Sequence, residues 1–296
     1  MPEIAFTPSS LMPVLRTACR EAGLACDGAD LVRLGENAIW HLRSQSVIVR
    51  IARSVEHLKR VEKELCVAQW LSDAGIPTVR VLDHVRQPIV IDDHPVSFWR
   101  ETDGDGPVPS AVDLAYLLKQ FHALRYCPCR LPDFDPLQTA EARFAAATGV
   151  ERRDREFLAD LCAKLSEELT SLEFALPLGP IHGDAHVANL LPDRGQVVLL
   201  DFESSASGPR EWDLLPTAIA VDRYGLSEDI YRTFVDVYGF DVREWAGYQL
   251  LRKVRELTMT TWLMQNVNEN SDIAAEFNRR IDSLRNEDFK NAWNRF

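Results

Sequence analysis

The sequence contains no apolar run that approaches the ~20 residues needed for a membrane-spanning helix. Its first ten residues, MPEIAFTPSS, lack the basic and then apolar pattern of a secretory signal. It also contains no internal repeat and no low-complexity segment. These absences argue against a membrane protein, a secreted precursor or a repeat array, and they predict a cytoplasmic protein.

The cysteines form no recognisable metal or redox motif. The one close pair, Cys127 and Cys129, is separated by a single proline, which is the wrong spacing for a zinc knuckle or a thioredoxin-like site. We therefore expect all six to be reduced thiols: Cys19, Cys26, Cys66, Cys127, Cys129 and Cys162.

Basic residues are outnumbered, with 33 Lys and Arg against 45 Asp and Glu, which gives a formal net charge of −12. Residues 1–101 are almost neutral, so nearly all of the acidic excess lies in residues 102–296. An acidic surface repels nucleic acid and anionic membranes, and it attracts cations. The charge therefore predicts no nucleic-acid partner and favours a cationic ligand, although an acidic surface also serves solubility alone.

The first 101 residues alternate short apolar runs with two helical patterns. Apolar residues at helical spacing predict helices over 9–24 and 54–75, and each pattern stops at a glycine. Two strands joined by a polar turn at 43–46 are expected within 38–53. Further strands are expected at 79–85, 88–92 and 95–101.

The segment TDGDGPVPS, residues 102–110, is rich in Gly, Pro and Asp, and we interpret it as a linker. Helical patterns dominate after it, over 110–124, 152–172, 211–221, 227–238, 243–267 and 272–294. One β interruption spans 189–202. The chain therefore predicts an α+β protein with a small β-rich lobe, 1–101, and a larger, mainly helical lobe, 102–296. Active sites tend to lie in clefts of such proteins.

The segment IHGDAHVANLL, residues 181–191, concentrates polar groups between apolar ones. It leads into NLLPDRGQVVLLDFE, a predicted hairpin with its turn at 192–195, which returns Asp201 toward the same loop. A loop keeps polar side chains in water, whereas a core helix would bury them unpaired. We therefore interpret this segment as a functional loop.

The blocks HGDAHVANLL, VVLLDFE and GPREWDLL resemble the aminoglycoside phosphotransferase and choline kinase family, whose signature is HGDxHxxN followed by a strand and an Asp. RLGENAIWHL, VIVRIAR, EKELCVAQWL and IPTVRVL are similar to the N-lobe of that family in order and spacing. The resemblance implies a two-lobed, protein-kinase-like fold. It also implies phosphoryl transfer from ATP, with GTP as the alternative nucleotide, and a requirement for Mg²⁺.

The resemblance assigns a role to each polar residue of the loop and hairpin. Asp184 is expected to accept the proton of an incoming hydroxyl, and His182 to brace the loop. Asn189 and Asp201 offer hard oxygen ligands for Mg²⁺. Structural support of the loop is expected from His186 and Asp213.

The nucleotide residues depart from the kinase pattern. The phosphate-covering loop holds one glycine, Gly35, followed by Glu36 and Asn37. Arg50 stands where such kinases have a lysine that contacts the phosphates; it keeps the charge but carries a wider, less mobile fork. Glu64 is its expected partner, with Glu62 as the fallback. Adenine is expected beside the backbone of Trp99, Arg100 and Glu101.

The acceptor is expected to be a small, cationic molecule with a hydroxyl group, such as an aminoglycoside, which makes antibiotic resistance one expected role. Its pocket should lie in the acidic helical lobe, and the candidate residues are Asp222, Glu256, Glu269 and Trp262. A kinase of choline, homoserine or a sugar is the alternative.

Two other classes of function fit parts of the same sequence. One is a nucleotide-binding module without activity, which the presence of Asp184, Asn189 and Asp201 disfavours. The other is a metallohydrolase that uses His182, Asp184 and His186, because imidazole and carboxylate side chains bind Zn²⁺ or Fe²⁺. The remaining histidines form no second cluster in the sequence.

Overall fold

The computed structural model describes residues 6–147, 149–268 and 270–295. The chain forms two compact units. The first comprises the described residues of Met1–Ser110 together with Ala123–Leu131 and Val187–Ser205, and the second contains the described remainder. Among the helices of the described chain, none has the length and apolar character needed to cross a membrane.

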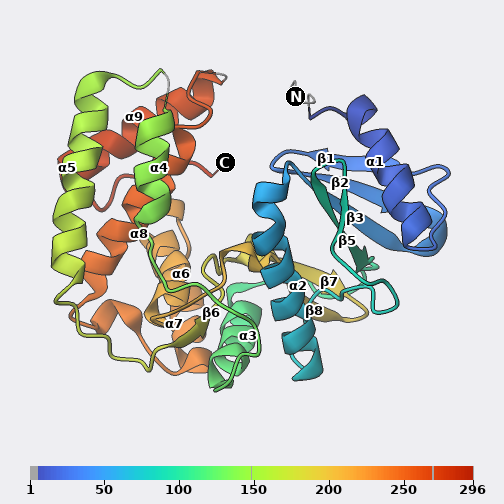
Figure 1. Cartoon of the computed structure of the whole chain (residues 1–296). Helices are drawn as coiled ribbons and strands as arrows, with labels where there is room; N and C mark the ends of the chain where they lie inside the picture. The colour runs from blue at the N-terminus through green and yellow to red at the C-terminus, as the bar shows by residue number, and fades with distance from the viewer. Residues whose placement is uncertain (1–5, 148, 269, 296) are drawn as a thin grey trace. The chain divides into compact units, whose positions relative to one another are not determined.

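The first unit is built on a five-stranded antiparallel sheet in the order β1-β2-β3-β5-β4 (Figure 1). Its strands are β1 (Asp30–Leu34), β2 (Asn37–Leu42), β3 (Val47–Ala52), β4 (Ile89–Ile91) and β5 (His94–Arg100). Its helices are α1 (Pro8–Glu21) and α2 (Leu58–Asp73), with short 3-10 turns η1 (Arg43–Gln45) and η2 (Val55–His57).

Helix α1 covers one face of this sheet. It begins with a capping box, in which the side chains of Thr7 and Ser10 reciprocally satisfy backbone N–H groups. The apolar side of α1 packs with Val49 and Ile51 of β3 in one buried core. Since successive residues of a strand point to opposite faces, Arg50 points away from this core, and its side chain pairs with Glu64 of α2.

The expected strand at 79–85 is wrong. Only the isolated bridge between Val81 and Trp99 joins this segment to β5, with backbone bonds from Leu82 N to Phe98 O and from Arg100 N to Arg80 O. The physical reason is that β4 pairs with the first half of β5 and leaves a short edge for 79–85. Strand β1, which the sequence did not predict, completes the opposite edge.

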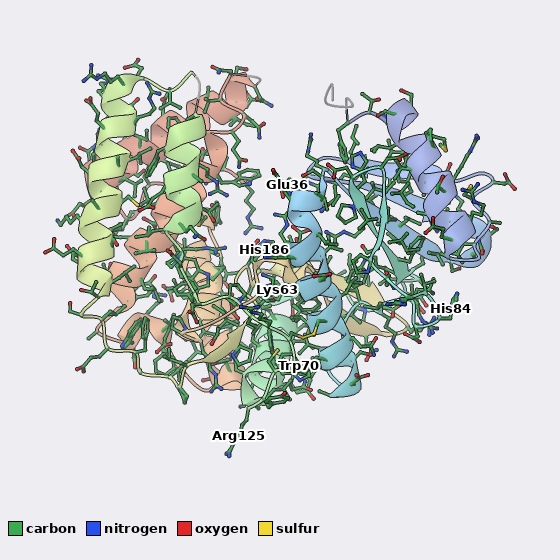
Figure 2. All side chains as sticks on the ribbon, in the orientation of Figure 1. Glu36, Lys63, Trp70, His84, Arg125 and His186 are labelled. Carbon is green, nitrogen blue, oxygen red and sulfur yellow. A yellow bond between two sulfur atoms is a disulfide. The ribbon has the colours of Figure 1, made fainter. Side chains whose placement is uncertain are left out.

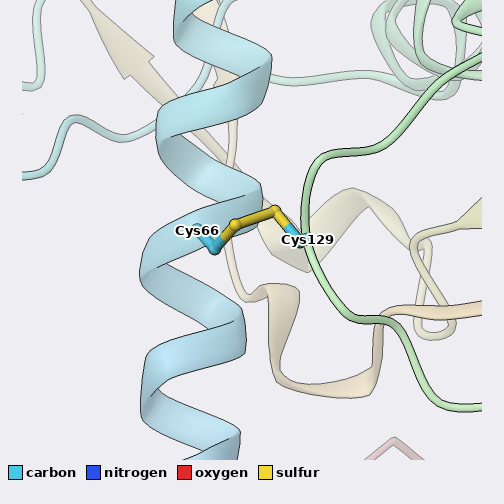
Figure 3. The surroundings of a disulfide bond; sticks show 2 residues. All are labelled: Cys66 and Cys129. Atoms are coloured by element: carbon cyan, nitrogen blue, oxygen red, sulfur yellow. A yellow bond between two sulfur atoms is a disulfide. The ribbon is translucent and has the colours of Figure 1, made fainter.

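The first unit also holds a disulfide, so the expectation of six reduced thiols is wrong. Cys66 on α2 is bonded to Cys129, 63 positions later, with their Cα atoms 5.8 Å apart (Figure 3). Cys19, Cys26, Cys127 and Cys162 are free. The pairing was invisible in the sequence because the two cysteines meet only when the segment 123–131 packs beside α2.

The predicted hairpin is confirmed and belongs to the first unit. Strands β7 (Leu190–Asp193) and β8 (Gln196–Leu199) pair around a tight turn in which Arg194 and Gly195 have positive φ. The 3-10 turns η3 (Val187–Asn189) and η4 (Phe202–Ser204) flank the strands.

The second unit is mainly helical. Its helices are α3 (Ala111–Ala123, whose last residue belongs to the first unit), α4 (Gln138–Ala146), α5 (Arg152–Leu169), α6 (Glu211–Tyr224), α7 (Glu228–Tyr238), α8 (Tyr248–Leu263) and α9 (Ser271–Arg285). A 3-10 turn, η5 (Val242–Glu244), precedes α8, and strands β6 (Gly179–Ile181) and β9 (Ala206–Gly208) form a small ladder. Helix α8 is central, because it contacts α4, α5, α6 and α9 (Figure 1).

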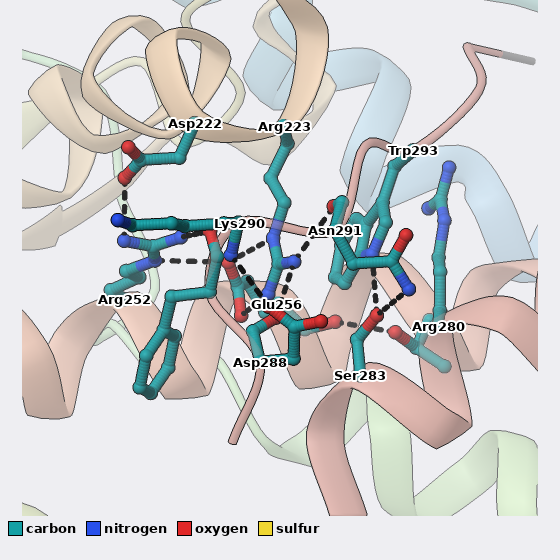
Figure 4. A network of polar contacts seen from close by, with 12 residues as sticks. Asp222, Arg223, Arg252, Glu256, Arg280, Ser283, Asp288, Lys290, Asn291 and Trp293 are labelled. Carbon is teal, nitrogen blue, oxygen red and sulfur yellow. Dashed lines mark hydrogen bonds and ion pairs between the residues drawn. The ribbon is translucent and has the colours of Figure 1, made fainter. Parts of the chain in front are cut away.

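The last expected helix, 272–294, ends early, at Arg285. Three buried arginines, Arg223, Arg252 and Arg280, donate to backbone carbonyls of the segment that follows (Figure 4). A helix would use those carbonyls internally, so these bonds favour an irregular course. The acceptors are the carbonyls of Asp288, Phe289, Asn291 and Asn294.

A β-rich unit and a mainly helical unit confirm the α+β class. Helix α4 and strands β6 and β9 were not predicted, since each is short and weakly periodic. The lobe boundary between residues 101 and 102 stays a prediction.

Candidate active site

The loop that contains His182 and Asp184 is fixed by Asp213 of α6. The backbone N–H groups of His182 and Gly183 donate to the two carboxylate oxygens of Asp213, at 2.6 and 2.8 Å. Asp213 also accepts from His122 of α3 at 3.0 Å and is fully buried. Gly183 has a φ of 86°, a conformation that residues other than glycine rarely adopt. Asp213 therefore fixes the loop through backbone N–H groups and does not use the side chains of His182 or Asp184 for this purpose.

Asp184 contacts two side chains of the second unit, those of Arg255 and His186. Arg255 of α8 forms an ion pair with its Oδ1, and His186 Nε2 lies 3.4 Å from its Oδ2. Burial acts to raise the pKa of Asp184, but Arg255 and His186 together hold it well below its usual range. His182 is fully buried, and its Nδ1 accepts from Asp184 N at 3.3 Å. These contacts keep Asp184 ionised and oriented.

Arg255 was missed by sequence reasoning. It lies on the helical pattern LLRKVREL beside Glu256, and nothing in that pattern distinguishes it from a solvated arginine. Its Nη1 also donates to Gly183 O at 3.3 Å, and its guanidinium lies 5.1 Å from the centre of the Trp212 ring.

In the first unit, Arg50 joins two acidic residues. Its Nη1 pairs with Glu64, which confirms the expected pairing, and its Nη2 lies 2.7 Å from Glu203 Oε1. Burial raises the pKa of Glu64 to about 7, and the neighbouring Arg50 opposes this shift. A role for these side chains at the nucleotide stays a prediction.

Glu203 is the second residue that sequence reasoning missed, although its place in DFE, two after Asp201, was a signal. Besides Arg50, its side chain accepts from Asn37 Nδ2 at 2.8 Å and pairs with Arg60 at 3.2 Å. Its backbone carbonyl accepts from Lys63, which projects from α2 (Figure 2), at 2.7 Å.

The expected metal ligands lie at one end of the hairpin. Leu200 N donates to Asn189 O at 3.1 Å, which brings Asn189 beside the residue that precedes Asp201. Asp201 has a positive φ of 66°, a conformation that often marks functional positions. Carboxylate oxygens of Asp201, Glu64 and Glu203 lie within 4.8 Å of one another. Such oxygen donors suit Mg²⁺.

The remaining nucleotide candidates lie at turns and at the end of β5. Gly35 N donates to Asn37 O at 3.1 Å, which closes the turn between β1 and β2, and Glu36 lies 3.6 Å from Arg60. Trp99 is buried, Arg100 pairs with Asp83, and Glu101 N donates to Ser46 O.

Two of the described acceptor candidates, Asp222 and Glu256, pair with the same side chain, that of Arg252. Glu256 is fully buried, and its carboxylate pairs with Arg223 and Arg252 (Figure 4). Asp222 pairs with Arg252 at 2.7 Å, Trp262 is partly exposed, and Glu269 lies outside the described residues. Because Glu256 is inaccessible and compensated by two arginines, we leave it out of the proposed acceptor site.

The metallohydrolase alternative finds little support in the described residues. The carboxylates placed for a shared ion are Glu64, Asp201 and Glu203, a set that includes neither His182 nor His186.

Comparison with known proteins also indicates a phosphotransferase. A sequence model of the phosphotransferase enzyme family (APH) matches residues 35–251, more than half of the chain. No curated protein sequence matches the chain.

Solved structures of several kinases have a similar fold. An amicoumacin kinase, hAmiN, in complex with AMP-PNP and Ca²⁺ is 13% identical over 95% of both chains, with a TM-score of 0.74. A microcompartment-associated aminopropanol kinase is 17% identical over 92% of this chain and 94% of its own, with a TM-score of 0.72. The choline kinase LicA from Streptococcus pneumoniae is 14% identical over 93% and 98%, with a TM-score of 0.66. The predicted protein-kinase-like fold is thereby confirmed.

Proposed function

The chain belongs to the phosphotransferase enzyme family and is a kinase for hydroxyl groups, and we propose that it uses Mg²⁺ and ATP to phosphorylate a small molecule in the cytoplasm. The observation that carries this proposal is the ionised and oriented carboxylate of Asp184. Its loop is held at the backbone by Asp213, and its carboxylate is kept ionised by the ion pair with Arg255 and oriented by Arg255 and His186.

The reaction requires alignment and charge neutralisation more than covalent work by the protein. The acceptor oxygen attacks the γ-phosphorus, and the bond from that phosphorus to the bridging oxygen breaks. ADP leaves with the electron pair, and the hydroxyl proton passes to Asp184. His182, Asp213 and His186 keep the loop in place during transfer, because they fix its backbone and the orientation of Asp184.

The nucleotide would be held by residues of the first unit. Arg50 would contact phosphate oxygens while Glu64 keeps its guanidinium in place. The turn formed by Gly35, Glu36 and Asn37 would cover the phosphates. Backbone groups of residues 99–101 would contact the base, and GTP is the alternative nucleotide.

Asn189 and Asp201 would hold Mg²⁺, and Glu203 adds a carboxylate close to Asp201. When bound, the ion neutralises negative charge on the phosphates. The carboxylates and the amide oxygen of this set fit such a hard cation.

We further propose a cationic acceptor, with an aminoglycoside-like antibiotic preferred and resistance as its role. The acidic excess of residues 102–296 supports this class, and two of the similar kinases are named for the amino alcohols aminopropanol and choline. Turnover of aminoglycosides, choline, homoserine, neutral sugars and macrolides at two ionic strengths tests it. Salt-insensitive phosphorylation of a neutral sugar alone would refute the cationic class.

The function itself is tested by Asp184→Asn in a coupled ADP-release assay with the best acceptor of that panel. We expect unchanged Mg·ATP affinity by calorimetry and a loss of turnover of roughly 10²–10⁴-fold. Asp229→Asn, on the exposed face of α7, is the matched control and should keep wild-type turnover. Near-wild-type turnover of Asp184→Asn would reject the assignment, and nucleotide binding without turnover of any acceptor would favour an inactive module.

A further inference from the structure

Arg255 makes two contacts with the loop of Asp184 and one with Trp212 of α6, and all three lie within the second unit. Its Nη2 pairs with Asp184 Oδ1, and its Nη1 donates to Gly183 O at 3.3 Å. Its guanidinium lies over the ring of Trp212, whose Nε1 donates to the same Gly183 carbonyl at 2.8 Å. Side chains from two helices, α6 and α8, therefore converge on one peptide group of the loop.

The Arg255 side chain is only 12% exposed, whereas that of Asp184 is 37% exposed. The guanidinium is therefore enclosed, while the carboxylate it contacts keeps access to solvent. An arginine whose stem and planar guanidinium are packed loses little freedom when it forms such a pair, and a cation–π contact with Trp212 adds to its stability. This enclosed, packed arrangement differs from an ordinary surface ion pair, in which both side chains are solvated and mobile.

We propose that Arg255 is a positioning residue, which fixes the orientation and the negative charge of the Asp184 carboxylate through Oδ1 so that the carboxylate can receive the acceptor hydroxyl. This role rests on the proposed kinase function. Each carboxylate oxygen accepts more than one hydrogen bond, so a hydroxyl can donate to an oxygen that also contacts Arg255 or His186.

The chemical consequence is a weakly basic Asp184. A carboxylate that is stabilised by a guanidinium does not remove the hydroxyl proton in advance. It orients the hydroxyl and takes the proton as the new oxygen–phosphorus bond forms, which fits a loose transition state for phosphoryl transfer. The groups that face Asp184 include Arg255 of α8 and His186 of its own loop. Asp213 of α6 accepts from the backbone N–H groups of His182 and Gly183 in the same loop.

The decisive experiment measures the Asp184 charge directly and does not depend on phosphoryl transfer. In protein labelled with ¹³C at the aspartate carboxyl, the Asp184 resonance is the one lost in Asp184→Asn. We expect no titration of this resonance in the wild-type protein between pH 8 and about pH 4, because the pKa of Asp184 is held below its usual value of about 3.9. Arg255→Met, which keeps a long apolar stem over Trp212, should raise the midpoint into this range, because the buried carboxyl then loses its guanidinium partner while the effect of burial remains.

Three further variants sharpen the result. Arg255→Gln is a second neutral variant that can still donate to Gly183 O, and it should show the same shift if Arg255→Met does not fold. Lys253→Gln removes one positive charge from the same helix, where Lys253 pairs with Glu287, and should leave the resonance unchanged. Trp212→Phe removes the bond to Gly183 O but keeps a ring under Arg255, so the resonance should again not titrate. A resonance in both neutral variants that behaves as in the wild-type protein would overturn the proposal.

A second arm follows Mg·ATP hydrolysis, with water as the acceptor, from pH 5 to 9. For both neutral variants we expect a lower plateau and an acid limb displaced to higher pH, because Asp184 must be ionised to act. A uniform loss with an unchanged profile would show that Arg255 only stabilises the fold. Absence of ATP binding and hydrolysis in the wild-type protein would reject the kinase function, while the carboxyl titration would still decide the role of Arg255.

Discussion

Arg50 and Glu203 stand 153 positions apart in the sequence, and their side chains form an ion pair of 2.7 Å. The pair links the middle of β3 to the residues that follow the hairpin. Arg50 also pairs with Glu64, so a phosphate that binds Arg50 meets a guanidinium already oriented by two carboxylates. An oriented guanidinium loses little freedom on binding, which favours a defined phosphate position.

We expect Arg50→Ala to raise the apparent KM for nucleotide about 10- to 100-fold, since a charged hydrogen bond contributes about 1.5–3 kcal/mol. Arg50→Lys should retain part of the affinity, because it keeps the charge but not the fork. Steady-state kinetics with ATP measures both. Arg86→Ala, an exposed arginine of the same unit, is the control. If neither substitution at position 50 changes the apparent KM for nucleotide, a residue other than Arg50 must contact the phosphates.

Asn189→Ala and Asp201→Ala should both weaken Mg²⁺-dependent nucleotide binding. Asp201→Ala should have the larger effect, because it removes a charged ligand and Asn189→Ala removes a neutral one. Calorimetric titration with ATP at several Mg²⁺ concentrations measures the change, and Asp27→Ala on the exposed surface is the comparison. Unchanged affinity in both variants would contradict the metal-ligand roles.

Glu256→Gln should lower the free energy of unfolding by roughly 3–5 kcal/mol, because it removes the carboxylate that pairs with the buried Arg223 and one of the two carboxylates that pair with the buried Arg252. Urea denaturation followed by circular dichroism gives the value. Glu287→Gln, at an exposed ion pair with Lys253, should change little. If Glu256→Gln instead lowers acceptor affinity without changing stability, Glu256 belongs to the acceptor site.

Removal of the disulfide by Cys66→Ser should lower the free energy of unfolding by roughly 2–4 kcal/mol, because the bond constrains a long loop in the unfolded chain. Cys127→Ser, which removes a free thiol beside Cys129, is the matched control. Thermal denaturation with and without a reductant measures the effect. If the reductant does not change the denaturation temperature of the wild-type protein, the disulfide does not form in solution.

Local sequence patterns determined much of the fold and the outline of the site. Helices such as α2 and α8 follow from apolar spacing, and the β7–β8 hairpin follows from a polar turn between two apolar runs. The resemblance of the block with His182, Asp184 and Asn189 to the family signature predicted a kinase loop, because those residues lie within one short segment of chain. Weakly periodic elements, such as α4 and β1, escaped prediction.

Only the tertiary structure decided which distant partners each side chain meets. Glu256 was expected at an acceptor, but the fold surrounds it with arginines from α6 and α8. Arg255, one position earlier on the same helix, faces the loop of Asp184 instead. The physical reason is that neighbouring helical residues point about 100° apart, so the packing of α8 alone determines which one enters the core and which one reaches the site.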